Sequence, residues 1–278
     1  MTKLLRANFA RLTKHCGFRS CMMFMASYGL FMVGTSYYLL CKSGYGILME
    51  NMCFGYAGLM GFVAAVFISL FLGTEYGDGT IRNKLTVGHK RSTVYLANLM
   101  VNAVGVLAAN AAYVAVLLLI GIPLFGPFRP TDPFELLTLT FLTVLMDLSW
   151  TAVFTLCSML NQNKAAVTAV SILSALMLSL ASGYIRSRLN EPKVFEPYTY
   201  VTDKGYEIHK EAEENPYYLE GTEREVYTFL NDFLPSGQEL QILNHDRGRE
   251  RQMALYSCLV TVLSTGSGIF IFKKKDIK

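Results

Sequence analysis

Six long apolar blocks constrain the fold of this chain more than any other feature of its sequence. They cover residues 20–40, 54–73, 95–125, 133–160, 165–183 and 253–272. A hydrocarbon layer of about 30 Å is crossed by roughly 20 helical residues, and inside lipid such a block can satisfy its backbone hydrogen bonds as a helix. The chain is 52% hydrophobic and 17% charged, which is unlike a soluble domain. We therefore predict an all-α integral membrane protein with six transmembrane helices.

The first block could instead belong to a cleaved signal peptide, because basic residues precede it. Its apolar stretch is too long for a signal peptide, and no A-x-A cleavage pattern follows it. We interpret it as a retained span.

The distribution of basic residues predicts the orientation of the spans. If the spans alternate, one side carries fourteen basic residues and the short loops of the other side carry only Lys42 and Arg129. The fourteen are Lys3, Arg6, Arg11, Lys14, Arg19, Arg82, Lys84, Lys90, Arg91, Lys164, Lys273, Lys274, Lys275 and Lys278. The positive-inside rule then places both termini in the cytoplasm of a multi-pass protein of the plasma membrane. These basic residues flank spans without an aromatic surface that could read bases, so we do not expect a nucleic-acid partner.

The polar segment 184–252 would lie outside the cell and is rich in glutamate. Thr222 and Glu225 have the spacing of a capping box, and Val226, Phe229, Leu230 and Phe233 recur at helical spacing before Pro235. This pattern predicts a helix whose apolar stripe docks on the membrane surface, on the outer ends of the spans, or in a small domain core. The predicted organisation is a lead-in helix over 1–19, five spans over 20–183, the extracellular segment 184–252, and a sixth span with a basic tail over 253–278.

The predicted connection between the second and third spans, residues 74–94, has the densest mixture of charge and glycine in the chain. Thr80 can cap a short helix over 81–87, and Gly88 can end it. Such a helix would offer Ile81 and Leu85, with Asn83 or Thr86, to a partner protein. Glu75, at the end of the second span, can pair with Arg82 or with a basic residue of the lead-in helix. The alternative is a solvated turn whose basic residues only set the orientation of the spans.

This connection resembles the ABC type-2 permease family, in which it has the form E-x-x-x-G-T-(I/L)-(R/E)-x-x-L followed by a small and a basic residue. The matching residues are Glu75, Gly79, Thr80, Ile81, Arg82, Leu85, Gly88 and Arg91. The resemblance implies that they couple the spans to a separately encoded ABC ATPase subunit. It covers essentially the whole chain, since the family also has six spans, both ends inside, a basic lead-in helix and its largest outer segment between spans five and six.

The resemblance also implies a function and partners. The family's permeases dimerise with a second copy or a paralogue, lie in membrane lipid and export amphipathic or apolar substrates. Residues 215–238 look similar to the branch of this family found in Gram-positive bacteria. Bacterial relatives of this shape export peptides such as bacteriocins, lantibiotics or toxins, or give resistance to them and to drugs. The alternatives are small-molecule drug efflux, an ATP-independent channel or secondary transporter, and a membrane-anchored sensor.

The sequence favours no catalytic chemistry of its own. It has no G-x-x-x-x-G-K-[ST] motif, so ATP and magnesium would be used by the partner ATPase and no cofactor is expected on this chain. The run 234–238 is superficially similar to the ABC ATPase signature, but we interpret it as a helix stop. The four histidines and six cysteines have no metal-ligand spacing. Cys41 and Cys53 flank one outer loop and could form a disulfide.

Four residues inside the predicted spans are candidates for a substrate path. The resemblance implies that the second and fifth spans line the path, which would include Phe62, Phe67 and Phe71. Asp147 is acidic within an apolar block, where charge is costly. It could serve substrate, helix packing or proton transfer, and we favour a carboxyl group hydrogen-bonded to a neighbouring helix.

The lead-in helix over 3–18 has an amphipathic pattern. Leu4, Leu5, Phe9 and Leu12 can face lipid, while Lys3, Arg6 and Arg11 stay in water. We therefore expect a helix lying in the membrane interface.

Overall fold

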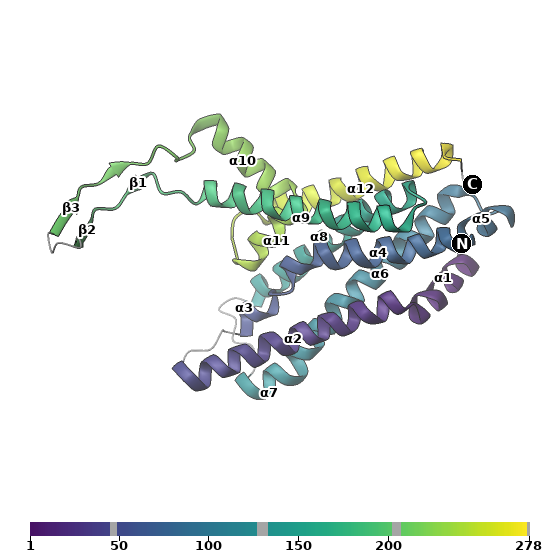
Figure 1. The fold of residues 1–278 in the computed structure, drawn as a ribbon, viewed down its shortest axis with the longest axis horizontal. Coiled ribbons are helices and arrows are strands. Elements are labelled where there is room, and N and C mark those ends of the chain that lie inside the picture. Colours follow the sequence, from purple (N-terminus) through teal and green to yellow (C-terminus); the bar gives the residue numbers. More distant parts are fainter. Residues whose placement is uncertain (45–48, 127–132, 202–206, 277–278) are drawn as a thin grey trace.

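Six helices that are each long and apolar enough to cross a membrane lie side by side in the computed structural model (Figure 1), which describes residues 1–44, 49–126, 133–201 and 207–276. They are α2 (Cys16–Ser43), α4 (Ala57–Gly77) with the short α3 (Met49–Cys53) before it, α6 (Arg91–Val116) continued by η1 (Leu117–Gly121) and α7 (Ile122–Phe125), α8 (Pro133–Leu160), α9 (Lys164–Leu189) and α12 (Glu250–Lys274). The predicted six spans are confirmed at this level. The π-helical turn η1 lies just before Pro123, whose ring cannot take part in the regular hydrogen-bond pattern of an α-helix.

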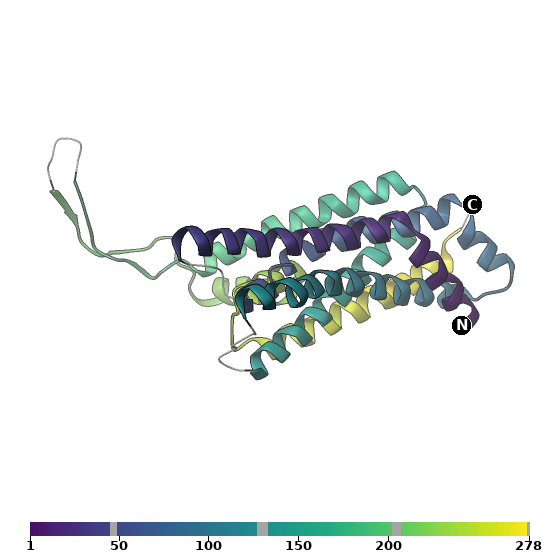
Figure 2. The same cartoon turned by 90° about the horizontal axis from the view of Figure 1, so that it is seen from below.

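The two ends of the bundle differ in character. Both chain termini lie at one end, called the terminal end below, together with α1 (Thr2–Lys14) and α5 (Thr80–Thr86) (Figure 1). The other end, called the hairpin end, carries α10 (Gly221–Phe233), α11 (Pro235–Leu243) and a long hairpin that projects away from the bundle (Figure 2). All the shorter elements therefore gather at the two ends of the spans.

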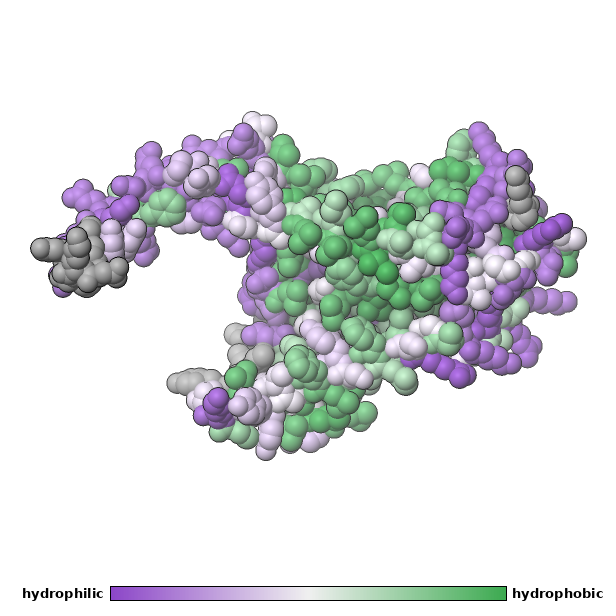
Figure 3. Space-filling model, viewed as in Figure 1, coloured by the Kyte–Doolittle hydropathy of each residue, from purple (hydrophilic) through white to green (hydrophobic). Residues whose placement is uncertain are grey.

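The surface between the two ends is apolar. Figure 3 shows a broad hydrophobic zone over the middle of the bundle, with hydrophilic residues at the terminal end and along the hairpin. Large apolar side chains of three different spans are exposed there, such as Phe31 of α2 (63%), Leu180 of α9 (62%) and Val262 of α12 (69%). Apolar surface on this scale is unfavourable in water and favourable in lipid. The chain is a multi-pass membrane protein.

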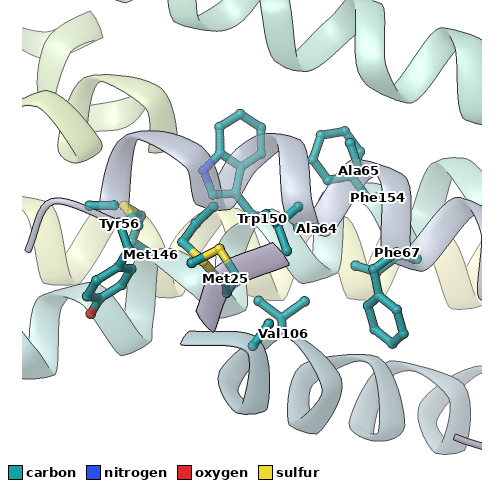
Figure 4. Packing of buried hydrophobic residues seen from close by; sticks show 14 of the residues in the cluster. Met25, Tyr56, Ala64, Ala65, Phe67, Val106, Met146, Trp150 and Phe154 are labelled. Carbon is teal, nitrogen blue, oxygen red and sulfur yellow. The ribbon is translucent and has the colours of Figure 1, made fainter. Parts of the chain in front are cut away.

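The core of the bundle lies between α4, α6 and α8 and is filled by aromatic and methionine side chains (Figure 4). Trp150 stacks on Phe154 with ring centroids 5.2 Å apart, and both are fully buried. A Cβ atom at Gly61 would lie 3.0 Å from the Trp150 ring, so the absence of a side chain there lets α4 approach α8 closely.

The hairpin corrects the all-α prediction. Its strands are β1 (Val194–Phe195), β2 (Tyr198–Val201), β3 (Glu207–Lys210) and β4 (Glu213–Glu214). β1 pairs with β4 and β2 pairs with β3, both antiparallel. The aromatic and β-branched residues of β1 and β2 favour extended backbone, and they lie beyond the bundle where no helix packs on them in Figure 1.

Several predicted boundaries and caps are wrong by a few residues. The polar segment between the fifth and sixth spans is shorter than predicted, because α9 continues to Leu189 and α12 begins at Glu250. α10 begins at Gly221, so Thr222 lies inside the first turn and no side chain caps the helix. Pro235 does end α10, but it also occupies the first turn of α11, where proline is well tolerated.

The stripe of α10 packs on the hairpin-end parts of α9 and α12. Phe229 and Phe233 stack on each other and both meet the ring of Tyr256 in α12. Docking on the spans is therefore the alternative that the structure supports.

The lead-in helix is also packed differently from its prediction. Leu4 and Leu12 are buried within the chain, and Leu4 packs with Val94 and Ala97 of α6. Arg11 turns inward to an ion pair with Glu75. The apolar face of α1 covers α6, and the helix ends at Lys14, before an extended His15.

Candidate functional site

The helix α5 is positioned at the terminal end by a glycine on each side. Gly79 is its N-cap residue with φ of 65°, a left-handed conformation that favours glycine. Gly88, with φ of 95°, follows the helix, and the N–H groups of Gly88 and His89 donate to Leu85 and Lys84 carbonyls. The predicted stop at Gly88 is confirmed. The predicted cap at Thr80 is wrong, because Thr80 is the first helical residue and makes no cap bond.

Glu75 lies at the centre of a buried polar cluster next to α5. Its side chain is fully buried, and it forms ion pairs with Arg11 and with Lys84, whose Nζ lies 2.6 Å from Glu75 Oε1. Asn98 Nδ2 donates to Glu75 Oε2 at 2.8 Å, and Asn8 Nδ2 donates to Asn98 Oδ1 at 2.8 Å. We name these five residues, which come from α1, α4, α5 and α6, the Glu75 cluster.

One carboxylate faces two cations in the Glu75 cluster. Burial, with Arg11 nearby, lowers the pKa of Lys84 to about 7, and the contact with Glu75 opposes the loss of its proton. Arg11 also donates to the Phe71 carbonyl at 2.8 Å and lies over the Phe71 ring. Removing Glu75 would leave Arg11 and Lys84 without their anion. The cluster therefore fixes α5 to three other helices.

The structure confirms one predicted partner of Glu75 and not the other. The sequence suggested either Arg82 or a basic residue of the lead-in helix, and Arg11 is that residue. Arg82 is exposed on α5. Arg91 binds elsewhere: its guanidinium donates to the carbonyl oxygens of Phe272 and Lys275 at the end of α12. Arg91 thus joins the start of α6 to the end of the last span.

The predicted apolar tip of α5 is wrong in its residues. Ile81 is fully buried in the core of the chain, and Leu85 is half-buried against the same core, so neither side chain is offered to a partner. Ile81 and Leu85 lie on the face of α5 that covers the ends of α4 and α6, so both side chains point inward. Val87 is exposed instead, with 79% of its surface accessible. Exposed Arg82, Asn83, Thr86, Val87 and Lys90 form what we call the α5 face.

Two further carboxyl groups are fully buried near the hairpin end of the core. Asp147 accepts a hydrogen bond from Asn110 Nδ2 of α6 at 2.9 Å, which confirms the favoured interpretation of this residue. Its other oxygen has no hydrogen-bond partner among the described residues. Glu239 of α11 accepts from the Trp150 indole N–H at 2.8 Å and from the Gly61 N–H at 3.1 Å. The described residues show no cation paired with either carboxyl group.

Sequence reasoning missed Glu239. It lies in the polar segment with many other glutamates, so its residue type did not distinguish it from exposed acidic residues. The available signal was the proline that starts α11 followed by helix formers, which predicts a second helix after α10. That this helix packs among α4, α8 and α9, with Gly237, Gln238, Glu239 and Gln241 buried, required the structure.

The aromatic residues proposed for a substrate path are mostly packed. Phe67 and Phe71 are buried, stack on each other, and also contact Phe18 and His15. Phe62 is half-buried against the same core. Neither Phe67 nor Phe71 lines an open path in this structure, because α1, α2 and α6 cover that side of α4.

Cys41 and Cys53 form no disulfide with each other. Among the described residues, no group of three His, Cys, Asp or Glu side chains could hold a metal ion.

No protein-family model and no curated protein matches this sequence.

Proposed function

We propose that this chain is the membrane-spanning subunit of an ATP-driven exporter of the ABC type-2 kind. The observation that carries the proposal is the attachment of α5 to the bundle through Lys84 and Glu75, 2.6 Å apart. A short helix between the second and third spans, rigidly joined to both and exposed on its other face, has the form that a coupling element requires.

The Glu75 cluster gives α5 a mechanical connection to the spans. A partner that presses on the α5 face moves Lys84, which is paired with the end of α4 through Glu75. Asn98 carries the same contact to α6, and Arg11 carries it to α1. Movement of α5 would thereby be transmitted to three helices. In this proposal the connection between the second and third spans still couples the spans to the ATPase. Glu75 links α5 to the spans, and Val87 contacts the ATPase.

The terminal end would face the cytoplasm in the plasma membrane. The basic residues of α1, α5, the start of α6 and the C-terminal tail gather at this end. The same end is where a soluble ATPase could bind, and ATP and magnesium would be used there by that subunit. The exposed apolar surfaces of α2 and α9 would contact membrane lipid or a second permease chain, as a homodimer or with a paralogue.

The proposed cargo is an amphipathic or apolar molecule, with a peptide such as a bacteriocin, lantibiotic or toxin as first choice, carried for export or for immunity. This choice comes from the resemblance of the chain to bacterial permeases of this shape, which export such peptides or give resistance to them. Small-molecule drug efflux is the alternative for the same machinery.

The test compares two exposed valines at opposite ends of the bundle. The chain is co-expressed with a separately encoded ABC ATPase of the same genome, starting with one encoded beside it, and co-purification and ATP hydrolysis are measured. Val87→Asp places a charge on the α5 face, so we expect recovery of the ATPase and its hydrolysis to fall at least tenfold. Val226→Asp, at a residue 49% exposed on α10, should change neither. Equal recovery with both variants would contradict docking on α5.

A second candidate is a secondary transporter that works without ATP. Asp147 and Glu239 favour it, because both carboxyl groups are buried without a paired cation among the described residues, and proton-driven transporters use such groups. Under this candidate, uptake or efflux in vesicles would follow an imposed proton gradient without ATP and would be lost in Asp147→Asn. Transport that requires ATP and persists without the gradient supports the exporter.

A further inference from the structure

The hairpin at the end opposite to the termini is an antiparallel ribbon that stands clear of the bundle (Figures 1 and 2). We name its described residues, 193–201 and 207–214, the arm. Val194 pairs with Glu214, Tyr198 with Lys210 and Thr199 with His209. Thr199 and His209 also share a side-chain hydrogen bond of 2.6 Å.

The root of the arm is closed by hydrogen bonds between its two sides. Asn215 is buried, and its Nδ2 donates to Glu191 Oε2 and to the Pro192 carbonyl, each at 2.9 Å. The Asn215 N–H donates to the Lys193 carbonyl, which closes the ribbon at its base. These bonds therefore close the hairpin at its base, just beyond the end of α9 at Leu189.

The arm is an incomplete sheet. Among the described residues each strand has one partner, so both outer edges of the ribbon carry backbone N–H and C=O groups that no other strand pairs. Two-stranded ribbons in water are marginally stable, and a third strand that adds to an edge supplies main-chain hydrogen bonds. Addition of an extended peptide to such an edge is a common mode of recognition.

One face of the ribbon presents aromatic rings to solvent. Tyr198 and Tyr200 point to the same side of β2, with ring centroids 6.0 Å apart, and are 55% and 42% exposed. Exposed tyrosine is a favourable contact residue because its rigid ring buries a large area at a small cost in entropy. The pair can cover apolar side chains of a strand placed beside β2.

The charge of the arm selects among possible occupants. Its exposed acidic residues are Glu196, Glu207, Glu211, Glu213 and Glu214, and its exposed basic residues are Lys193 and Lys210. The arm of a second copy would carry the same excess of negative charge and would be repelled, as would an anionic lipid surface. A basic peptide in extended conformation has both the charge and the backbone that the edge requires.

We propose that the arm captures a cationic peptide by adding it as a third strand, with glutamate side chains pairing with its basic residues and the two tyrosines with its apolar ones. This deepens the proposed function by naming the class of cargo, and it rests on that function only for what happens to the peptide after capture. Binding itself is a property of this chain and can be measured without any ATPase.

The experiment uses the purified full-length chain in nanodiscs of neutral phosphatidylcholine, without ATPase. The probe is a fluorescent dodecapeptide of alternating lysine and valine, and its binding is followed by anisotropy against empty nanodiscs. Two comparison peptides replace lysine by glutamate or valine by proline, which removes the charge match or the ability to add a strand. We expect at least tenfold weaker binding of both comparison peptides.

Matched variants locate the site. Two variants of the arm should each weaken binding of the lysine peptide about tenfold: the triple variant Glu207→Gln, Glu211→Gln, Glu213→Gln and the double variant Tyr198→Ala, Tyr200→Ala. The control is the triple variant Glu220→Gln, Glu223→Gln, Glu225→Gln, which removes three exposed charges next to the arm. It should change binding less than about twofold. All these positions are exposed, so the variants are expected to fold.

Three results would overturn the proposal: no binding of the lysine peptide above empty nanodiscs, equal binding of the proline peptide, or equal losses in the arm and the control triple variants. The exporter and the arm can fail separately. Peptide binding by a chain that recruits no ATPase would keep the arm proposal and remove the exporter. ATPase coupling by a chain that binds no peptide would do the reverse.

Discussion

Lys84 Nζ lies 2.6 Å from a Glu75 carboxylate that is fully buried, and the two residues come from different helices at the end of the bundle where both termini lie. Glu75 is also paired with Arg11 and bound by Asn98. Through this one carboxylate the second span, the short helix α5, the third span and the lead-in helix are held together. The exposed face of α5 is thereby connected to the core without being part of it.

The first prediction concerns the charge of Glu75. Glu75→Gln keeps the size of the side chain but leaves Arg11 and Lys84 without their anion, so we expect a loss of about 3–5 kcal/mol in the free energy of unfolding, measured in detergent. The control is Glu220→Gln, which breaks an exposed ion pair with Lys193 at 3.4 Å and should cost less than about 1 kcal/mol. Equal losses in both variants would show that the Glu75 cluster does not stabilise the bundle.

The second prediction separates hydrogen bonding from charge at Glu239. Glu239→Gln retains an oxygen that can accept from Trp150 and Gly61, so its stability should stay within about 0.5 kcal/mol of the wild type. Glu239→Leu leaves the buried indole N–H unpaired and should cost about 1–3 kcal/mol. The measurement is the thermal unfolding of both variants, together with that of Trp150→Phe, which removes the indole N–H itself. A glutamine variant as unstable as the leucine variant would mean that the carboxyl group acts through more than these two hydrogen bonds.

The third prediction compares two glycines of α12. A Cβ atom at Gly268 would overlap with the Tyr95 ring, which is itself fully buried, so Gly268→Ala should cost about 1–3 kcal/mol. A Cβ atom at Gly266, two residues earlier, meets nothing within 4 Å, and Gly266→Ala should be neutral or stabilise by about 0.5–1 kcal/mol. Similar unfolding temperatures for the two variants would contradict the close packing of α12 on α6.

The fourth prediction is a dependence on pH through His15. Burial, with Arg11 and Lys164 nearby, lowers the pKa of His15 from its ordinary 6.5, and its ring contacts Phe71 edge-on. The unfolded chain therefore binds a proton more readily, so this contribution to stability is complete above pH 6.5 and is lost as the pH falls. Unfolding temperatures measured from pH 8 to pH 5 should fall less steeply in His15→Gln than in the wild type. Parallel curves would exclude His15 as a source of the dependence.

Much of the candidate site could be read from the sequence. The motif from Glu75 to Gly88 predicted a short helix between two spans, a stop at Gly88 and an ion pair between Glu75 and the lead-in helix, and each is present. These features depend on glycine conformation and on opposite charges at a helix end, which are local properties. Which side of α5 faces the core depends on helices distant in sequence, and there the prediction was wrong: Ile81 is buried and Val87 is exposed.

The sequence alone determined that this chain forms six long apolar helices, because block length and apolar composition suffice for that conclusion in lipid. Only the tertiary structure decided which polar residues are buried. Asn98 and Glu239 carry no mark of burial in their own segments, and each is enclosed because helices distant in sequence pack on it. The strands of the arm were also decided by the tertiary structure. The same residues could have formed a loop, because β2 becomes a strand only by pairing with β3 on the other side of the hairpin.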